Sequence, residues 1–123
     1  MLHAILCYNS EETVFSWTRE EDAAVMARLA VVQERLAREG KLGPSLRLQP
    51  TKTAATLRKG KDPYVTDGPF AETKEAILGF YVVDVASTEE ALEIARELTE
   101  ANPGPGAYEV RPIGYFHAGN SLR

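Results

Sequence analysis

The sequence predicts an α+β domain in which two helices cover one face of an antiparallel sheet. Three observations lead to this prediction: strand-like apolar segments recur along the chain, two stretches have helical apolar spacing with capping signals, and the two kinds of segment alternate. The order is strand, helix, strands with a hairpin, strand, helix, strand, which is the split βαβ arrangement of ferredoxin-like folds with a β-hairpin inserted at its centre. With 123 residues, the chain is expected to form one domain over residues 1–123.

The first strand and the first helix are predicted from apolar patterning. Residues 2–8 form a short, nearly all-apolar run, which is typical of a strand. A helix is expected over residues 18–40. Thr18 and Glu21 have the spacing of a capping box, and Gly40 can adopt the left-handed conformation that ends a helix. The apolar stripe of this helix consists of Val25, Met26, Leu29, Val32 and Leu36.

The middle of the chain has the pattern of short, fragmented strands. Residues 53–58 and 64–66 flank a turn-forming segment at residues 59–62, and this arrangement predicts a hairpin. The chain then breaks at residues 67–69, where Asp, Gly and Pro follow one another.

The second half of the chain predicts a strand, a helix and a final strand. Residues 77–85 are rich in β-branched and aromatic side chains, which favour a strand. Ser87 and Glu90 repeat the capping-box spacing, and the Pro- and Gly-rich segment 102–106 ends the second helix. Residues 108–113 form the last strand.

The two central strands, residues 2–8 and 77–85, are apolar on both sides. The helices can cover only one face of the sheet, so the other face would be a large exposed apolar patch on a monomer. We therefore expect a homodimer in which a second copy packs sheet to sheet, giving a dimeric α+β barrel.

Composition narrows the classes of partner and cofactor. Fourteen basic against eighteen acidic side chains give a net charge of −4, which argues against a nucleic-acid partner. The longest apolar stretch, residues 23–32, is too short to span a bilayer, and no export signal is visible, so we expect a cytoplasmic protein without a membrane partner. The single cysteine excludes an internal disulfide, and the two histidines lack metal-ligand spacing; no metal or other cofactor is expected.

Residues 67–70 have two interpretations. As a turn alone, Asp67 would hydrogen-bond the backbone, and Gly68 before a proline would be extended. As part of a site, the rigid loop would present Asp67, Glu72 and Lys74 to a cleft. Glu72 and Lys74 are either a solvated surface pair or close enough to shift each other's pKa for acid–base work.

A second candidate site lies on the sheet face opposite the helices. Tyr81, Glu109 and Arg111 are expected to converge there, with His3 nearby. These groups around an apolar cavity would suit a small anionic or aromatic ligand. In the alternative interpretation, Glu109 and Arg111 pair across the dimer interface and His3 is a core or interface residue. Cys7 is expected to be a small buried hydrophobe.

Residues 65–75, with the sequence VTDGPFAETKE, resemble the signature of the DGPF proteins, a branch of the YCII-related family. The similarity extends to residues 79–85, 89–92 and 110–112, and therefore covers nearly the whole chain. The resemblance implies the dimeric ferredoxin-like barrel. It also implies a link to extracytoplasmic-function sigma factors, near which many DGPF proteins are encoded.

The resemblance implies two further features of function. A few members of the wider YCII family are lyase-like or dehydrochlorinase-like enzymes that act on aromatic substrates. The chemistry proposed for the wider family uses a histidine in or near the first helix, paired with an aspartate. Residues 18–39 of this chain contain no histidine.

The sequence therefore predicts a cytoplasmic homodimer that binds a small molecule in a cleft near residues 67–70. Any chemistry would be proton transfer or elimination, with Asp67 or Glu72 as the catalytic base. The expected ligand contacts are His3, Phe70, Lys74, Tyr81, Glu109 and Arg111. The alternative functions are a regulatory or interaction module linked to a sigma factor, and a structural dimer with no dedicated ligand.

Overall fold

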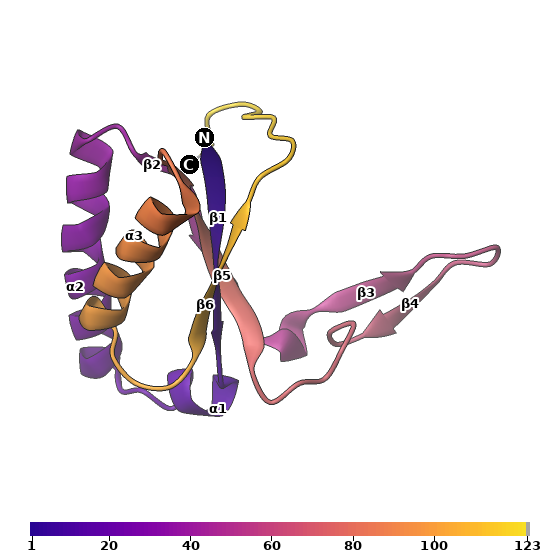
Figure 1. The fold of residues 1–123 in the computed structure, drawn as a ribbon. Coiled ribbons are helices and arrows are strands. Elements are labelled where there is room, and N and C mark those ends of the chain that lie inside the picture. Colours follow the sequence, from indigo (N-terminus) through magenta and orange to yellow (C-terminus); the bar gives the residue numbers. More distant parts are fainter. Residues whose placement is uncertain (123) are drawn as a thin grey trace.

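The computed structural model describes residues 1–122 and shows an antiparallel four-stranded sheet with two long helices on one face (Figure 1). The strands are β1 (Leu2–Asn9), β2 (Leu42–Arg47), β3 (Ala55–Arg58), β4 (Tyr64–Asp67), β5 (Ala76–Asp84) and β6 (Ala107–Pro112). The helices are α1 (Glu11–Val14), α2 (Arg19–Arg38) and α3 (Thr88–Ala101), with a 3-10 turn, η1, at Thr51–Thr53. The strand order β2–β5–β1–β6 is consistent with a ferredoxin-like arrangement, and the predicted α+β class is confirmed.

Helix α2 begins and ends at the predicted signals. Thr18 Oγ1 accepts a hydrogen bond from the Glu21 N–H at 3.0 Å, and a Glu21 carboxylate oxygen accepts one from the Thr18 N–H at 3.1 Å. Gly40 ends the helix with a φ of +71°, and its N–H donates to the Ala37 carbonyl at 3.0 Å. The buried side chains of α2 are Val25, Leu29 and Leu36.

Helix α3 has a variant of the predicted capping box. Ser87 Oγ accepts a hydrogen bond from the Glu90 N–H at 3.2 Å, but the Glu90 carboxylate accepts from the N–H of Ala86 at 2.9 Å instead of from Ser87. The side chains that α3 buries against α2 and the sheet are Ala91, Ile94, Ala95, Leu98 and Ala101. None of the helices within residues 1–122 is long and apolar enough to cross a membrane.

The short helix α1 was not predicted, because four residues are too few to show helical periodicity. Ser10 Oγ accepts a hydrogen bond from the Thr13 N–H at 3.4 Å, and Val14 is buried. The Glu11 carboxylate accepts from the backbone N–H of Thr51 at 3.2 and 3.3 Å. This contact joins α1 to the segment that follows β2.

The register of the sheet decides which side chains face the helices. Ile5 on β1 lies opposite Tyr81 on β5 and Val110 on β6, and all three pack in the core beneath the helices. Leu6 lies opposite Phe80 and Glu109, which therefore share the other face. We call this second face, on which no helix packs, the open face.

The predicted convergence of Tyr81 and His3 with Glu109 and Arg111 is therefore wrong. Tyr81 and His3 point toward the helices, and both are buried. Glu109 and Arg111 lie on the open face and are exposed. The pairing of odd-numbered positions in β1 and β5 with even-numbered positions in β6 separates the two sets.

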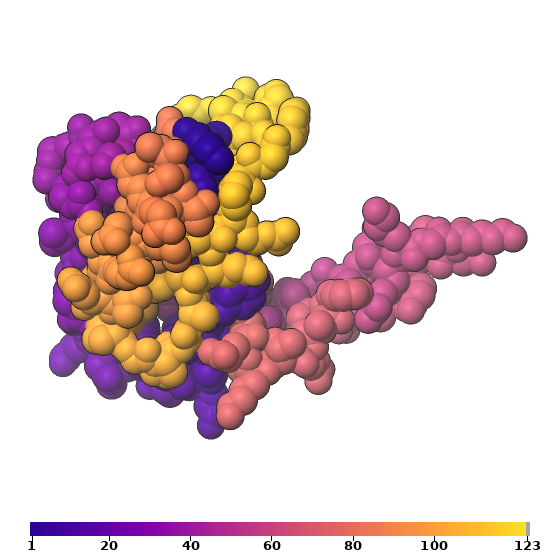
Figure 2. All heavy atoms as spheres, in the orientation of Figure 1, coloured from indigo at the N-terminus to yellow at the C-terminus, as the bar shows by residue number. Residues whose placement is uncertain are grey.

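Strands β3 and β4 form a separate two-stranded sheet, with Ala55 opposite Asp67 and Arg58 opposite Tyr64. Together with η1 and the residues up to Phe70 they make up a segment, residues 51–70, that we call the arm. The arm extends away from the main sheet on the side opposite the helices (Figure 1) and stands clear of the body over most of its length (Figure 2).

The arm leaves the body between two strands that lie very close together. The Leu48 N–H donates to the Leu78 carbonyl at 2.8 Å, and a side chain at Gly79 would collide with the backbone carbonyl of Leu46 on β2. Leu78 is the extra residue of a β-bulge, because Cys7 pairs with Gly79 whereas Tyr8 pairs with Ile77.

We expect Gly79→Ala to destabilise the protein by about 1–3 kcal/mol, because the methyl group forces β2 and β5 apart. Urea denaturation followed by far-UV circular dichroism measures the change. Gly114→Ala is the matched control, since no atom lies within 4 Å of a methyl group there and its φ is not positive. Equal denaturation midpoints for the two variants would contradict the close approach.

Candidate functional site

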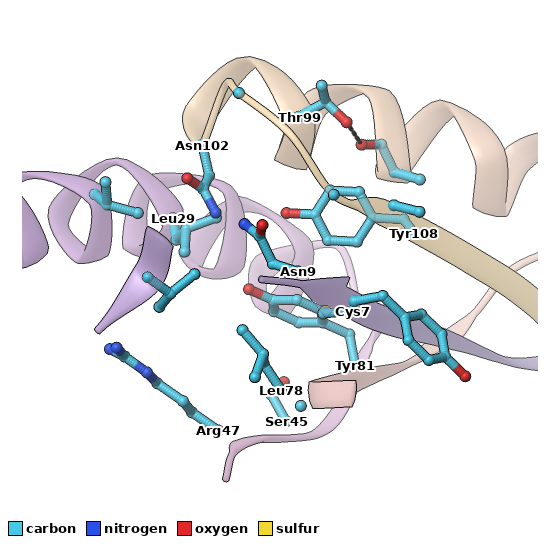
Figure 3. Close-up of a pocket in the computed structure, with 18 of the residues that line it drawn as sticks. Cys7, Asn9, Leu29, Ser45, Arg47, Leu78, Tyr81, Thr99, Asn102 and Tyr108 are labelled. Atoms are coloured by element: carbon cyan, nitrogen blue, oxygen red, sulfur yellow. Dashed lines mark hydrogen bonds between the residues drawn. The ribbon is translucent and has the colours of Figure 1, made fainter. Parts of the chain in front are cut away.

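A cavity of about 590 Å³ lies between the helices and the main sheet. Residues of α2, α3 and all four strands of the sheet line it, and its walls are mostly apolar (Figure 3). The volume is within the range of small-molecule pockets. Its main apolar walls are Trp17, Val25, Met26, Leu29, Leu78 and Leu92.

Two tyrosines and two asparagines supply the polar groups at one end of the cavity. Tyr81 comes from β5 and Tyr108 from β6; Figure 3 shows that both phenol oxygens point toward the side where the amides of Asn9 and Asn102 lie. The Asn9 Oδ1 atom accepts a hydrogen bond from the Ser10 N–H at 2.7 Å, which fixes the orientation of that amide.

Burial keeps the thiol of Cys7 and the phenols of Tyr81 and Tyr108 in their neutral forms. It raises the pKa of Tyr108 to about 12, an effect that Cys7 and Tyr81 reinforce and the Asn102 side chain partly opposes. Burial also raises the pKa of Tyr81, and raises the pKa of the Cys7 thiol to about 12. At neutral pH the two phenols are therefore hydrogen-bond donors, and Cys7 is a thiol with little nucleophilic character.

The charged side chains of the lining lie at its edge and are paired. Arg47 Nη1 lies 2.9 Å from a carboxylate oxygen of Asp22, and Arg96 Nη1 lies 2.7 Å from one of Glu93. Among residues 1–122, no aspartate, glutamate or histidine lines the cavity, and no group of three His, Cys, Asp or Glu side chains could hold a metal ion. The lining therefore offers hydrogen bonds and apolar contact, but no side chain of the kind that serves as a base near neutral pH.

Of the sequence-predicted site residues, Tyr81 alone lines the cavity. His3 is fully buried beside the start of α3, with Nε2 3.0 Å from Thr88 Oγ1 and Nδ1 3.3 Å from the Met1 carbonyl oxygen. On the open face, the Tyr8 hydroxyl donates to a Glu109 carboxylate oxygen at 3.3 Å. The two contacts of His3 connect β1 to the start of α3, which is a structural role.

The loop at residues 67–70 is organised within the arm, away from the cavity. Gly68 has a φ of +93°, not the extended conformation that we expected, and its N–H donates to the Ala54 carbonyl at 2.8 Å. The Arg58 guanidinium lies over the Phe70 ring, 4.6 Å from its centroid. These contacts give the loop a structural explanation.

The other predicted site residues near the loop are exposed. Asp67, Glu72 and Lys74 lie at the surface, and no ion pair joins Glu72 to Lys74 in the part of the chain that the structure describes. The structure therefore does not bring the predicted catalytic carboxylates together with Tyr81, or with the cavity.

Sequence reasoning missed Tyr108, Asn9 and Asn102 as cavity residues. Asn9 directly follows the predicted first strand, and Asn102 is the first residue of the segment that ends the second helix. The signal that could have found them is topological: the chain leaves β1 and α3 at the same end of the sheet, where β6 also begins, so residues at these three ends meet.

The raised pKa values predict that stability falls at high pH. In the unfolded chain Cys7 and Tyr108 have ordinary pKa values of 9.0 and 10.0, whereas in the folded protein both are about 12. The unfolded state therefore loses these protons first. The free energy of unfolding should be level below about pH 8 and fall as the pH rises toward 12.

Urea denaturation at a series of pH values measures this dependence. Tyr108→Phe should lose stability less steeply above pH 9 than the wild type, because one of the two groups is gone. Tyr64→Phe on the arm, where the side chain is 59% exposed, is the control and should follow the wild type. Identical pH slopes for both variants would refute the contribution of Tyr108.

Comparison with known proteins agrees with the resemblance seen in the signature segment. The family model described as the YCII-related domain matches residues 1–117. The chain is also 53% identical, over 120 residues and 97% of each chain, to a protein of Rhizobium meliloti (strain 1021) that is described only as uncharacterised. A match over nearly the full length, joined to the α+β fold, shows that the chain belongs to the YCII-related family.

Proposed function

We propose that the protein binds a small molecule in the cavity between its helices and its main sheet. The observation that carries this proposal is the pairing of an apolar cavity of about 590 Å³ with the hydroxyl groups of Tyr81 and Tyr108 at one end. A pocket of mostly apolar walls with a few convergent polar groups is the usual form of a ligand site. This position replaces the cleft near residues 67–70 that the sequence predicted.

The polar end of the cavity defines the chemistry of the ligand. Neutral phenols donate hydrogen bonds, and the amides of Asn9 and Asn102 can donate and accept them. The ligand is therefore a compact aromatic or alicyclic molecule with a carbonyl, carboxylate or hydroxyl group at one end. The lining supports binding more than acid–base catalysis; for Asp67 or Glu72 to act as a base on a ligand in the cavity, the carboxylate would have to come from another chain.

We propose further that the protein works as a homodimer in which two open faces pack together. The open face carries Leu6 and Phe80 on the central strands, and no helix covers it. Glu109 and Arg111 lie on the same face of β6, so a two-fold axis can place the carboxylate of one chain near the guanidinium of the other. The link to a sigma factor stays a prediction, since neither the cavity nor the open face bears on it.

Binding is tested with 4-hydroxybenzoate, 4-hydroxybenzamide and cyclohexanecarboxylate as probes. We expect at least one of them to shift the ¹⁵N-amide resonances of cavity residues on β1, β5 and β6, with the arm unaffected. The double variant Tyr81→Phe, Tyr108→Phe keeps both rings and should bind that probe about tenfold more weakly, because two hydrogen-bond donors are lost. Tyr64→Phe, on the exposed arm, is the matched control and should bind like the wild type.

Two results would overturn the proposal. One is the absence of any cavity shift at millimolar concentrations of all three probes. The other is a double variant that binds as tightly as the wild type, which would mean that the two hydroxyl groups do not contact the ligand.

A further inference from the structure

The two faces of the arm differ in how well they are covered. On one face, Thr56 Oγ1 donates to the Gly68 carbonyl at 2.8 Å and Arg58 stacks on Phe70, so the loop at residues 67–70 covers part of that side. On the other face, Leu57 and Val65 lie directly opposite each other, with 61% and 66% of their surfaces exposed. An apolar cross-strand pair is thus left bare on one side of the ribbon.

In the part of the chain that the structure describes, the arm differs from the main sheet in having only two strands and no helix packed on either face. Isolated hairpins are marginally stable in water, and stable ones pack a face against something. Apart from its base, where Thr51 contacts Glu11, the arm has no such support within residues 1–122, because it stands clear of the body (Figure 2). Within residues 1–122, a single chain therefore provides nothing that covers the Leu57–Val65 face.

Two observations favour a second copy of this chain as that cover. The arm projects on the side of the main sheet opposite the helices, which is the side of the open face (Figure 1). A chain packed on the open face would therefore lie beside the arm. Residues 51–70 also carry four basic and two acidic side chains, whereas the whole chain has a net charge of −4, so the arm is electrostatically complementary to the remainder of an identical chain.

We infer that the arm is a clasp between subunits, in which the Leu57–Val65 face packs against the copy that covers the open face. This inference rests on the homodimer proposed above and adds to it the contact surface. It carries Asp67, the last residue of β4, to the partner. The signature loop is then part of an interface, which accounts for its distance from the cavity of its own chain.

The contact is tested by comparing the alkylation of a cysteine at position 65 with one at position 31. Val31 on α2 is 67% exposed and Val65 is 66% exposed in the single chain, so Val31→Cys is a matched control for Val65→Cys. Cys7 contributes little background, because it is only partly exposed and its raised pKa keeps the thiol protonated. Sedimentation first gives the protein concentration at which the dimer dissociates. The rate of reaction with iodoacetamide is then measured above and below that concentration. Each rate is divided by the rate of the same variant in urea, which corrects for the intrinsic reactivity of the thiol.

In the dimer, Val65→Cys should react at least about tenfold more slowly than Val31→Cys, and the two should react equally after dissociation. Val65→Asp should weaken the dimer about tenfold or more, whereas Val31→Asp should leave its dissociation constant unchanged. Equal rates at positions 65 and 31 in a stable dimer would overturn the clasp and leave the homodimer standing. A wild-type protein that sediments as a single chain at every concentration would overturn both, and slow alkylation in such a monomer would show that the arm packs on its own body.

Discussion

The pairing of β1 with β5 is the constraint on which the rest of the structure depends. Because Ile5 lies opposite Tyr81, the odd-numbered residues of β1 and of the part of β5 that follows the bulge at Leu78 face the helices, and their even-numbered neighbours face outward. This one register places the phenol of Tyr81 in the cavity and Leu6 and Phe80 on the open face. A slip by one residue would exchange the two faces and take the Tyr81 phenol out of the cavity.

The extent to which the fold could be predicted follows from the range of the interactions involved. The capping box at Thr18 and the glycine stop at Gly40 are local, so the bounds of α2 could be predicted closely from neighbouring residues. The strand pattern of residues 108–113 likewise depends only on neighbouring residues. The relation between β6 and β5 passes through β1 and depends on long-range pairing, and for that reason Tyr81 was assigned to the wrong face.

The candidate site was harder to predict than the fold, because its residues come from ends of elements. Asn9 directly follows the predicted first strand and Asn102 begins the segment that ends the second helix, and no pattern in either segment indicates that the two ends meet. The unusual residues of the loop at residues 67–70 predicted a site there. Gly68, with its positive φ, and Phe70, stacked on Arg58, shape the arm instead. The segment with the most distinctive composition, residues 67–70, is therefore a candidate interface, and residues that belong to no sequence motif line the cavity.

The narrow base of the arm divides the molecule into two structural units, the arm and the body that contains the cavity. The hydrogen bond between Leu48 and Leu78 already brings the two attachment points together, so a short turn could join β2 to β5 without disturbing the cavity walls. Insertions, deletions and sequence drift in the arm are thereby insulated from the pocket. Under the two proposals made above, a change in the arm would alter how two subunits recognise each other and leave the small-molecule site as it is, and a change in the cavity walls would do the reverse.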